Sequence, residues 1–573
     1  MTTSVSGTTS STSTTTKTTA SQNRNTFDSS ALAQEGYNNK LAKADSLNVK
    51  VTKNEAKIAA YQNLQTLMAA VKSPLDTLRS APGTAGKESD AFLNRSTYLT
   101  SSTSTSASSI LSATAADGTE VGVHDIVVTQ IAKVERLGGS SQSSRSSALS
   151  LAGTFTLGSK ATADGLSSTV TPGATITITA GMSLDDIANT INAAKTSTGV
   201  SASVVKSSDN SYMIVLAGVE TDRDITLATG SGDNILSKLG LIDDSGNKVA
   251  PLQKAQGAKL TVDSVAITGA TNEIKGAIDG VTLSLYKADP LNTLSLEVDS
   301  DLKGIKTQIT NFVTAYNSLR DFILVNQSTN SDGTAGTDAA LFSDSLLREI
   351  TTSLQSIMTT GVNGVSLATI GITLDLNNKL VVADTTLDTA LSSSLSSVKS
   401  LFSYQMTSSS PDLELLTHGD GPTSANFDLK VTVDAVTGKV TGASVNGDES
   451  LFTFSDNTIK GVAGSIYDGL SLVYSGKTSQ TVNVKISQGI ADQLYQSIET
   501  ASNTYNGQIT TAVNDLKKDN SDLGARITTI GQNAAIYRDF LLDKYAKVEA
   551  KLAKAQSVLD LLKALNSAEN KSS

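Results

Sequence analysis

Residues 523–562 read LGARITTIGQNAAIYRDFLLDKYAKVEAKLAKAQSVLDLL, and this stretch decides the fold of the chain. A repeat that averages 3.5 residues places one apolar seam along a helix, as in coiled coils. One extra four-residue step at Tyr545 corresponds to a stutter, which relaxes the supercoil and keeps the seam. The pattern predicts one helix over 490–565, about 110 Å long, which needs a partner to cover its seam. The seam residues are Leu523, Ile527, Ile530, Ala534, Tyr537, Leu541, Tyr545, Val548, Leu552, Ala555, Leu559 and Leu562.

The predicted partner lies near the other end of the sequence. Between residues 51 and 78, apolar residues again recur at threes, fours and one seven. Before this helix, Gly36 predicts a break in a short helical segment over 27–41. Near the end of the helix itself, Pro74 predicts a kink or a restart. We expect the two seams to be interaction sites that pair with each other or with other subunits. The candidate residues are Ile58, Tyr61, Leu64, Met68, Leu541, Val548, Leu552, Leu559 and Leu562.

The composition narrows the function class. A chain of 573 residues should hold about three or four domains, because single cores seldom exceed ~250–300 residues. The sequence has 0 Cys, which excludes disulfides, thiol catalysis and thiolate metal sites. Its net charge of -10 argues against a nucleic-acid partner. The Ser/Thr-rich residues 1–30 lack the apolar run of a signal peptide, and no stretch approaches the ~20 apolar residues of a membrane span.

The change from helical to strand periodicity predicts a multidomain α+β fold, with mainly-β head domains inserted between coiled-coil helices from both termini that form a stalk or leg. Residues 151–245 read as strand, strand, helix, strand and strand, with Ser183 as the helix N-cap. The predicted parts are a disordered tail (1–30), the N-terminal leg helix (31–80), a β head domain in two pieces (88–150 and 255–300), an inserted outer head domain (151–245), a helical stalk section with a β-hairpin at 372–382 (301–405), an additional β-domain (410–488) and the C-terminal leg helix (489–573).

A weak internal repeat links two of these parts. Residues 278–286 read IDGVTLSLY and residues 467–474 read YDGLSLVY. Each is followed by an alternating strand and then by a helix. Either a duplication or a chance match of two Asp-Gly turns explains the similarity.

Residues that could carry chemistry are few. His124 and His418 are the two histidines, and neither has a second histidine near it in sequence to form a metal pair. The acidic turns at 222–224 and 243–247 lack the ligand spacing of an EF-hand loop. The sequence contains no phosphate-binding, nucleophile-elbow, zincin or dinucleotide-binding motif. We therefore expect a protein that is not an enzyme and that uses no cofactor or metal.

Five stretches, in this order, resemble one known family. They are NEAKIAAYQ (54–62), ITAGMSLDDIANTIN (178–192), DGVTL with LSLEVD (279–283 and 294–299), NFVTAYN (311–317) and GIADQL (489–494). The sequence resembles the bacterial flagellar filament-capping proteins, also called hook-associated protein 2 or FliD. The second stretch is similar to a module that capping proteins share with flagellin-type insertions. The chain departs from the family in its first residues, where a Ser/Thr tail precedes the helix-prone start.

The resemblance implies an extracellular protein at the distal tip of the flagellar filament, exported through the flagellar type III apparatus without a cleaved signal peptide. Its β-domains would form the plate of a homo-oligomeric ring of about five subunits, and its terminal helices the legs. The ring would retain exported flagellin and promote its folding and polymerisation. Implied partners are other copies of the chain, flagellin, hook-associated junction proteins and an export chaperone, with no nucleic acid and no membrane span.

Other functions stay open at this stage. Another flagellar axial protein, such as a flagellin or a hook–filament junction protein, would share the terminal helices and β-inserts. A surface adhesin that binds host glycans would also fit the Ser/Thr-rich domains. An enzyme within the β-domains would require a pocket with clustered acidic or aromatic residues.

Overall fold

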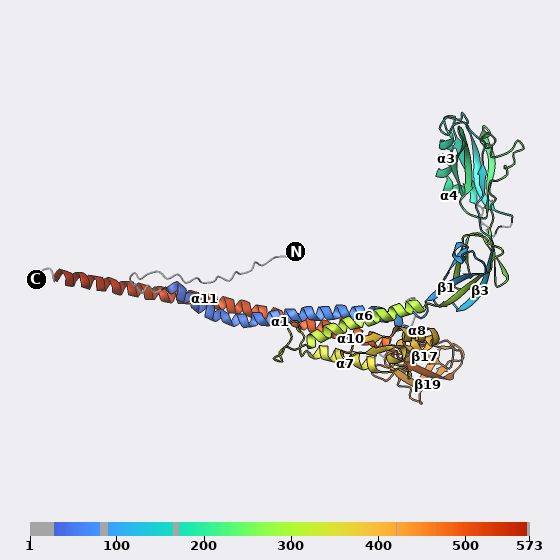
Figure 1. Cartoon of the computed structure of the whole chain (residues 1–573). Helices are drawn as coiled ribbons and strands as arrows, with labels where there is room; N and C mark the ends of the chain where they lie inside the picture. The colour runs from blue at the N-terminus through green and yellow to red at the C-terminus, as the bar shows by residue number, and fades with distance from the viewer. Residues whose placement is uncertain (1–27, 81–89, 164, 166–170, 420, 570–573) are drawn as a thin grey trace. The chain divides into compact units, whose positions relative to one another are not determined.

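The computed structural model describes residues 28–80, 90–163, 165, 171–419 and 421–569, and within them combines long helices with seven small antiparallel sheets (Figure 1). The predicted mixture of helices and several small sheets is confirmed. The chain divides into two units. We call them the helical unit (Met1–Thr66, Val325–Leu347 and Ala501–Ser573) and the β-rich unit (Leu67–Leu324 and Arg348–Thr500). Most of the predicted tail, residues 1–27, lies outside the described residues.

Helix α1 (Ser29–Leu78) is one uninterrupted helix. The predicted break at Gly36 is therefore wrong, and the helix continues through Pro74 without a restart. A proline inside a helix removes one backbone hydrogen bond and costs about 3 kcal/mol. Here Pro74 lies in the last turns, where Val71, Leu75 and Leu78 are fully buried, and this burial offsets the cost.

The C-terminal stretch forms two helices, α10 (Ile490–Ser502) and α11 (Gln508–Glu569), so the predicted single helix over 490–565 is wrong. The interruption has the sequence NTYNG (503–507). The side-chain oxygen of Asn503 accepts hydrogen bonds from the backbone N–H groups of Tyr505 and Asn506, at 2.8 and 3.2 Å. Asparagine competes in this way with helical backbone bonding, which ends one helix and allows the next to begin.

The first β-domain consists of two antiparallel sheets that enclose a common core. Buried residues of the core include Ile126, Leu283 and Leu296. The larger sheet has the order β1 (Arg95–Ser101), β14 (Leu294–Ser300), β3 (Gly122–Gln130), β10 (Ala258–Val262) and β11 (Val265–Gly269); the smaller has the order β12 (Glu273–Lys275), β13 (Val281–Leu285) and β2 (Leu111–Ala115).

The inserted domain lies in the sequence between β3 and β10. The predicted order of two strands, a helix and two strands is confirmed by β5, β6, α3, β7 and β8, and sequence reasoning missed β9. One sheet has the order β4 (Arg136–Gly138), β8 (Ser211–Gly218) and β7 (Val200–Ser208); the other has the order β6 (Thr171–Ile178), β5 (Gly153–Ala161) and β9 (Arg223–Gly232). The helices are α3 (Leu184–Ala193), α4 (Lys195–Thr198) and α5 (Ile235–Lys238).

Ser183 is the N-cap of α3, as the sequence predicts. Its hydroxyl accepts a hydrogen bond from the backbone N–H of Asp186 at 3.2 Å, and the Asp186 carboxylate accepts one from the Ser183 N–H at 3.0 Å. This reciprocal pair is a capping box. The hydrogen bonds from Ser183 lower the pKa of Asp186. The capped helix buries Leu184, Ile187, Ala188 and Ile191 in the core of the inserted domain.

The second β-domain also consists of two antiparallel sheets. In its core the rings of Phe427, Phe452 and Tyr467 pack together, with centroids 4.6 and 4.8 Å from Tyr467. One sheet has the order β17 (Gln405–Ser408), β24 (Gln480–Ser487), β19 (Ser424–Val433) and β20 (Val440–Val445); the other has the order β18 (Leu413–Thr417), β23 (Ser471–Tyr474), β22 (Thr458–Gly461) and β21 (Phe452–Ser455).

The two β-domains share one strand topology. The order β1-β14-β3-β10 in the first corresponds to β17-β24-β19-β20 in the second, and β2-β13-β12 corresponds to β18-β23-β22. The repeated Asp-Gly turns precede β13 and β23, and Gly280 and Gly469 have φ values of +73° and +83°, which favour glycine. β14 leads into α6 (Leu302–Gln327) as β24 leads into α10. This agreement favours duplication over a chance match of two turns.

The section between the two β-domains is helical. The predicted hairpin at 372–382 is confirmed by β15 (Ile372–Leu374) and β16 (Leu380–Val382), with Asn378 at φ +58° in the turn. Asn317 of α6 exchanges two hydrogen bonds with the backbone of Leu380, which fixes the hairpin to that helix. The remaining elements are α7 (Ser345–Thr359), the 3₁₀ helix η2 (Leu367–Ile370), α8 (Asp384–Ser393) and α9 (Leu395–Phe402).

Replacing Ser183 by Ala should destabilise the inserted domain by about 1 kcal/mol, because the N–H of Asp186 loses its acceptor. Hydrogen exchange of the α3 amides should then be about fivefold faster. The matched control is Thr190→Ala on the same helix, whose exposed hydroxyl bonds only the Asp186 carbonyl. Unchanged α3 exchange in Ser183→Ala would show that the capping box contributes nothing to stability.

Candidate assembly surface

Helices α1 and α11 lie side by side and antiparallel within the helical unit (Figure 1). Near the start of α11, the Gln65 side chain donates to the hydroxyl of Thr510 at 2.9 Å. Further along, the Asn54 amide donates to carboxylate Oδ2 of Asp519 at 2.8 Å and to Oδ1 of Asn520 at 2.9 Å. Residue numbers therefore fall along α1 as they rise along α11.

Gly36 marks a close approach of the two helices. A Cβ atom at this position would lie 2.4 Å from Cδ1 of Leu541 and 3.3 Å from Cε1 of Tyr537. The glycine that predicted a helix break is thus the residue that lets Leu541 pack against the α1 backbone. Leu541 is 7% exposed as a result.

Two aromatic rings near Gly36 pair with cations of the opposite helix. The ammonium of Lys40 lies 4.9 Å from the ring centroid of Tyr537, and the guanidinium of Arg538 lies 5.8 Å from that of Tyr37. Such cation–π pairs contribute about 0.5–1 kcal/mol each at exposed sites. Because each helix supplies one ring and one cation, the two pairs help to fix the register of α1 against α11.

A tyrosine–aspartate hydrogen bond connects α1 to the segment before α7. The hydroxyl of Tyr61, a residue that is 4% exposed, donates to Oδ1 of Asp344 at 2.8 Å. The same carboxylate accepts the backbone N–H of Leu347 in the first turn of α7 and lies 3.7 Å from the Lys57 ammonium. Burial and the bond to Asp344 raise the pKa of Tyr61 well above its ordinary value, so its hydroxyl remains a donor.

The structure separates the predicted seam residues into two groups. Tyr61, Leu64, Met68 and Leu541 are buried, and Ile58 is partly buried. Val548, Leu552, Leu559 and Leu562 are exposed by 36%, 51%, 50% and 57%. The predicted intrachain pairing of Ile58, Tyr61, Leu64 and Met68 with these four is wrong, because the antiparallel register places the first turns of α11 opposite that part of α1.

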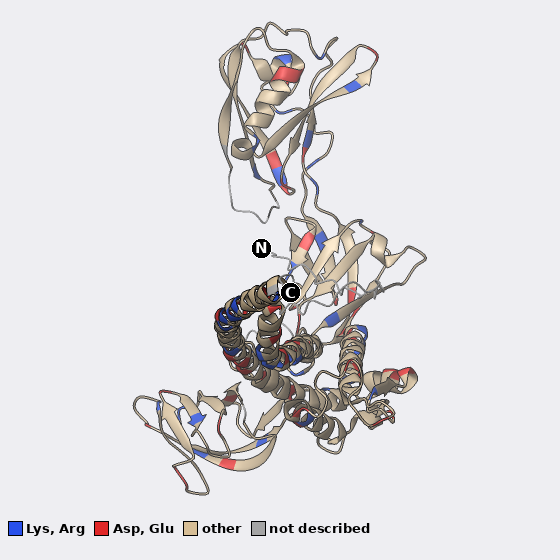
Figure 2. Cartoon of the chain, turned by 90° about the vertical axis from the view of Figure 1, so that its left-hand side faces the viewer, with Lys and Arg blue, Asp and Glu red and all other residues tan. Residues whose placement is uncertain are grey.

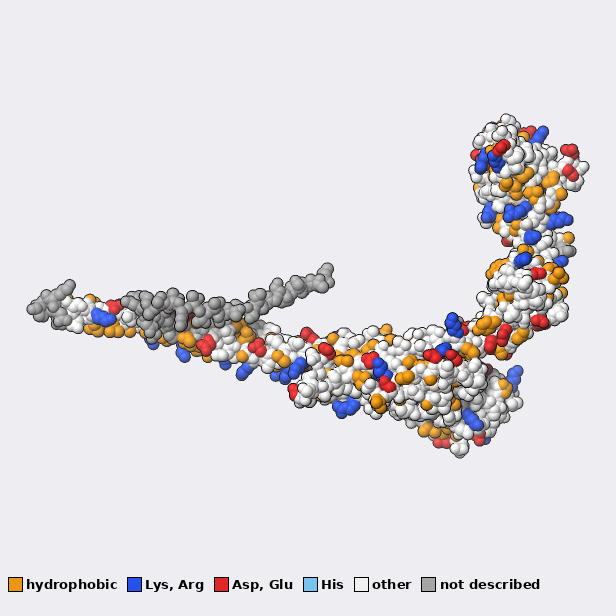
Figure 3. All heavy atoms as spheres, viewed as in Figure 1, with side chains coloured by type: hydrophobic (Ala, Val, Ile, Leu, Met, Phe, Trp, Pro, Cys, Tyr) orange, Lys and Arg blue, Asp and Glu red, His pale blue; other side chains and the backbone are white. Residues whose placement is uncertain are grey.

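The covered part of the α11 seam ends near Leu541. Beyond it, eight Leu and Val side chains of α11 lie at the surface of the helical unit, with exposed fractions between 36% and 62% (Figure 3). Contiguous exposed apolar residues of this kind mark sites of protein interaction. We call this set the open seam: Leu542, Val548, Leu552, Val558, Leu559, Leu561, Leu562 and Leu565.

Charged side chains line the helices more densely than the strands, many of which carry none (Figure 2). Among the described residues, no three or more His, Asp or Glu side chains are placed to hold a metal ion. Nδ1 of His124 lies 2.8 Å from Asp263, and Nε2 of His418 lies 3.4 Å from Asp492. No described helix is long and apolar enough to cross a membrane.

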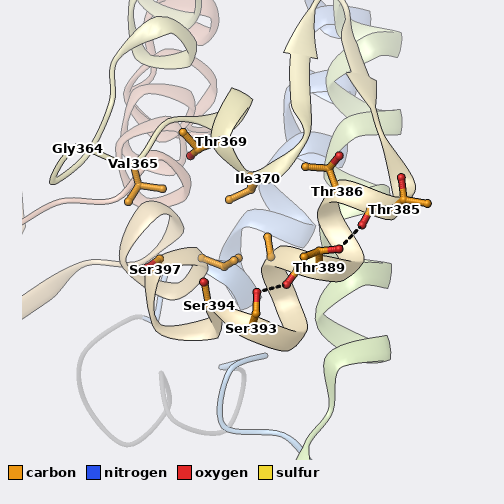
Figure 4. A pocket seen from close by; sticks show the side chains of 12 residues that line it. Gly364, Val365, Thr369, Ile370, Thr385, Thr386, Thr389, Ser393, Ser394 and Ser397 are labelled. Atoms are coloured by element: carbon orange, nitrogen blue, oxygen red, sulfur yellow. Dashed lines mark hydrogen bonds between the residues drawn. The ribbon is translucent and has the colours of Figure 1, made fainter.

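A pocket of about 580 Å³ lies between η2, α8 and α9 (Figure 4). None of the described side chains that line it is charged. Several of its hydroxyls bond to the backbone of their own helix: Thr389 donates to the Thr385 carbonyl at 2.8 Å, and Ser393 donates to the Thr389 carbonyl at 2.6 Å. These two hydroxyls are therefore already engaged as donors.

Replacing Gly36 by Val should destabilise the pairing of α1 with α11 by about 1–3 kcal/mol, because the added methyl groups overpack the contact with Leu541. Hydrogen exchange of residues 30–45 should become faster. The control is Gly531→Ala on α11, where a Cβ meets no atom within 4 Å. That change should stabilise the helix by about 0.5–1 kcal/mol. Slower exchange in both variants would disprove the close approach at Gly36.

The comparisons with known proteins agree with one another. Residues 255–557 match the family "Flagellar hook-associated protein 2 C-terminus", residues 25–135 match its N-terminus, and residues 165–220 match the "Flagellin hook IN motif". The last match falls within the inserted domain and supports the predicted similarity of 178–192 to a shared module.

Two relatives from known bacteria are similar over about half of the chain. The A-type flagellar hook-associated protein 2 of Pseudomonas aeruginosa is 28% identical over 52% of this chain and 65% of its own length. The flagellar hook-associated protein 2 of Escherichia coli K12 is 30% identical over 56% of this chain and 69% of its own length. Each alignment thus leaves about a third of the relative unmatched.

A crystal structure of the D1-D2-D3 domains of the flagellar cap protein FliD from Escherichia coli is 24% identical, with 80% of this chain and 99% of that chain covered. Its TM-score of 0.49 is too low to carry an argument about domain arrangement. The family assignment rests on the sequence match over residues 255–557, which is more than half of the chain. The chain belongs to the flagellar hook-associated protein 2 family.

Proposed function

We propose that this protein is the filament cap of the bacterial flagellum. It forms a homo-oligomeric ring at the distal, extracellular tip of the filament, where it retains exported flagellin and promotes its folding and polymerisation. Family membership supports the role, and the open seam of α11 is the observation that carries the mechanism. Its other partners would be the hook-associated junction proteins and an export chaperone.

In this proposal the long helices and the β-domains have different roles. Helices α1 and α11 form a coiled-coil leg, supported by the 3.5-residue repeat and by the antiparallel contacts from Gln65 to Gly36. The two β-domains and the inserted domain form the plate. The proposal keeps the predicted domain limits, except that the C-terminal part is divided into α10 and α11.

The open seam is proposed to bind filament subunits. Among the described residues, α1 covers the preceding seam as far as Leu541. Burying a Leu or Val side chain contributes about 1.5–3 kcal/mol. Several such residues on one face could therefore hold the leg to the filament end while permitting release when a new subunit enters.

The mechanism requires confinement and binding, with no covalent step. A plate above the filament end would keep an exported flagellin from diffusing away. The legs would leave a limited space in which the subunit folds against its neighbours. Apolar, non-directional contacts suit this task because a cap must rebind as the filament grows.

Replacing both Leu552 and Leu559 by Asp should abolish capping, because two carboxylates in the seam oppose its burial. The double variant is expressed in cells that lack the wild-type chain. Monomeric flagellin should appear in the medium, with hooks but no filaments on the cells. The β-domains should remain folded, as judged by circular dichroism of the purified variant.

The matched control is the double variant Ala550→Asp with Ser557→Asp, which adds the same charge to exposed positions off the seam. It should support filaments of normal length. Filaments that also form with Leu552→Asp and Leu559→Asp would rule out the leg mechanism. Normal filaments with reduced attachment to surfaces, in cells that lack the chain altogether, would favour an adhesin.

A further inference from the structure

One apolar side chain lies entirely in solvent on a tight turn. Leu376 belongs to the turn between β15 and β16, where residues 375–378 read DLNN. It is 103% exposed, the largest fraction among the large apolar side chains of the described residues. Turns favour Gly, Pro, Asn, Asp and Ser because of their backbone geometry or their hydrogen bonds. A leucine offers neither, so its presence at the tip of this hairpin suggests a contact outside the subunit.

The turn that carries Leu376 is held in one conformation. The Asp375 carboxylate accepts the backbone N–H of Asn377 at 2.8 Å. The guanidinium of Arg320, a residue of α6 that is 4% exposed, donates to the Asn377 carbonyl from Nε at 3.3 Å and from Nη2 at 2.9 Å. A buried cation thus fixes the tip of the hairpin. A tip that is already ordered loses little conformational freedom when it binds, which favours its use as a contact.

The pocket between η2, α8 and α9 suits an uncharged, mainly apolar occupant (Figure 4). Its volume is about 580 Å³, and none of the described side chains that line it is charged. The acidic side chains of α8 pair with α6, because Asp384 and Asp388 lie 3.0 and 2.8 Å from the Lys306 ammonium. The apolar side chains that line the pocket are Val365, Ile370, Ala390 and Val398.

The hairpin tip does not reach the pocket of its own subunit. Ile370 at the end of η2 lines the pocket, and in Figure 4 the two strands that follow run away from it. At about 3.4 Å per residue, the tip lies about 15–20 Å from Ile370. The two hydrogen bonds between Asn317 and the Leu380 backbone hold the hairpin against α6. The tip and the pocket are therefore two separate surfaces of the β-rich unit.

A ring needs two such surfaces on every subunit. Rotational symmetry of more than two copies repeats one head-to-tail contact, in which one surface of a copy fits a different surface of the next. The same symmetry keeps each part of the subunit at one radius and one height. A contact between two neighbouring parts of the same unit can therefore recur around the ring. The tip and the pocket meet these conditions, and the pairing of an uncharged pocket with a leucine is complementary in chemistry.

We propose that the hairpin tip with Leu376 inserts into the pocket between η2, α8 and α9 of the next copy of the chain. The inference rests on the proposed function, since it assigns the surfaces through which subunits of that ring meet. Burial of a fully exposed leucine in an uncharged pocket is favourable without a charged partner. The hydroxyls of Thr389 and Ser393 already donate to carbonyls of α8, so they require no acceptor from the occupant.

The test places one cysteine on each surface. The chain has 0 Cys, so Leu376→Cys with Ser394→Cys introduces its only two thiols. Ser394 lines the pocket, is exposed and makes no cap hydrogen bond through its side chain. Cells that keep the wild-type chain also express this tagged double variant, so that filaments form in every case. Their flagella are sheared off and oxidised, and the tagged chain should give a ladder of linked copies on a non-reducing gel.

Matched variants separate this contact from random oxidation. Each single variant should remain unlinked, because its thiol meets no second thiol. In the control pair, Leu291→Cys replaces a leucine that is 93% exposed on a turn of the first β-domain and is combined with Ser394→Cys. We expect about tenfold more linked chain with Leu376→Cys than with this control, because a disulfide requires Cα atoms within about 7 Å of each other.

Glutaraldehyde treatment of the same flagella traps any ring, whichever surfaces form it. Glutaraldehyde oligomers without a disulfide ladder would overturn the contact, leave the ring in place and point to an occupant of the pocket other than a second copy. Absence of both would overturn the ring and the contact together. Linked dimers from Leu376→Cys alone would show that two tips meet each other, which also contradicts the proposal. A ladder confined to the pair of Leu376→Cys and Ser394→Cys would establish it.

Discussion

The helical unit depends on one constraint: the apolar face of α11 needs a partner to cover it. A helix of 62 residues with one apolar and one charged face gains little stability from its backbone hydrogen bonds alone. α1 covers α11 from Thr510 to Leu541, where the absence of a side chain at Gly36 lets Leu541 pack against the α1 backbone. Beyond Leu541 the same repeat continues with Val548, Leu552, Leu559 and Leu562 exposed, and in our proposal this part of the helix binds filament subunits.

The periodicity of the two terminal helices could be predicted from the sequence because each seam residue contributes independently to one repeating signal. The role of Gly36 could not be predicted from its neighbours in the sequence, because it depends on Leu541, which is 505 residues away. The interruption at 503–507 carried a signal in its own sequence, since NTYNG is rich in turn-forming residues. The strong apolar repeat on both sides of it outweighed that signal.

The assembly surface was predictable only in part. Tyr61 and Leu64 belong to a repeat and are buried as a repeat requires, but the bond from Tyr61 to Asp344 has no local signature. The exposed positions Leu552 and Leu559 have the same pattern as the covered ones. A single sequence encodes which face of a helix is apolar, whereas the register of two antiparallel helices decides which part of that face remains open.

The two β-domains show how one strand topology can carry different contacts at its root. Each is attached through two adjacent strands, and in each the loop after the second strand folds back onto the root. In the first domain, which carries the long insertion between β3 and β10, Arg95 donates to the carbonyl of Thr119 in that loop. The second domain carries no such insertion, and the ring of His418 in its equivalent loop stacks on Tyr404. Because the sheets have the same strand order, the two domains differ at the root in these few side chains rather than in topology.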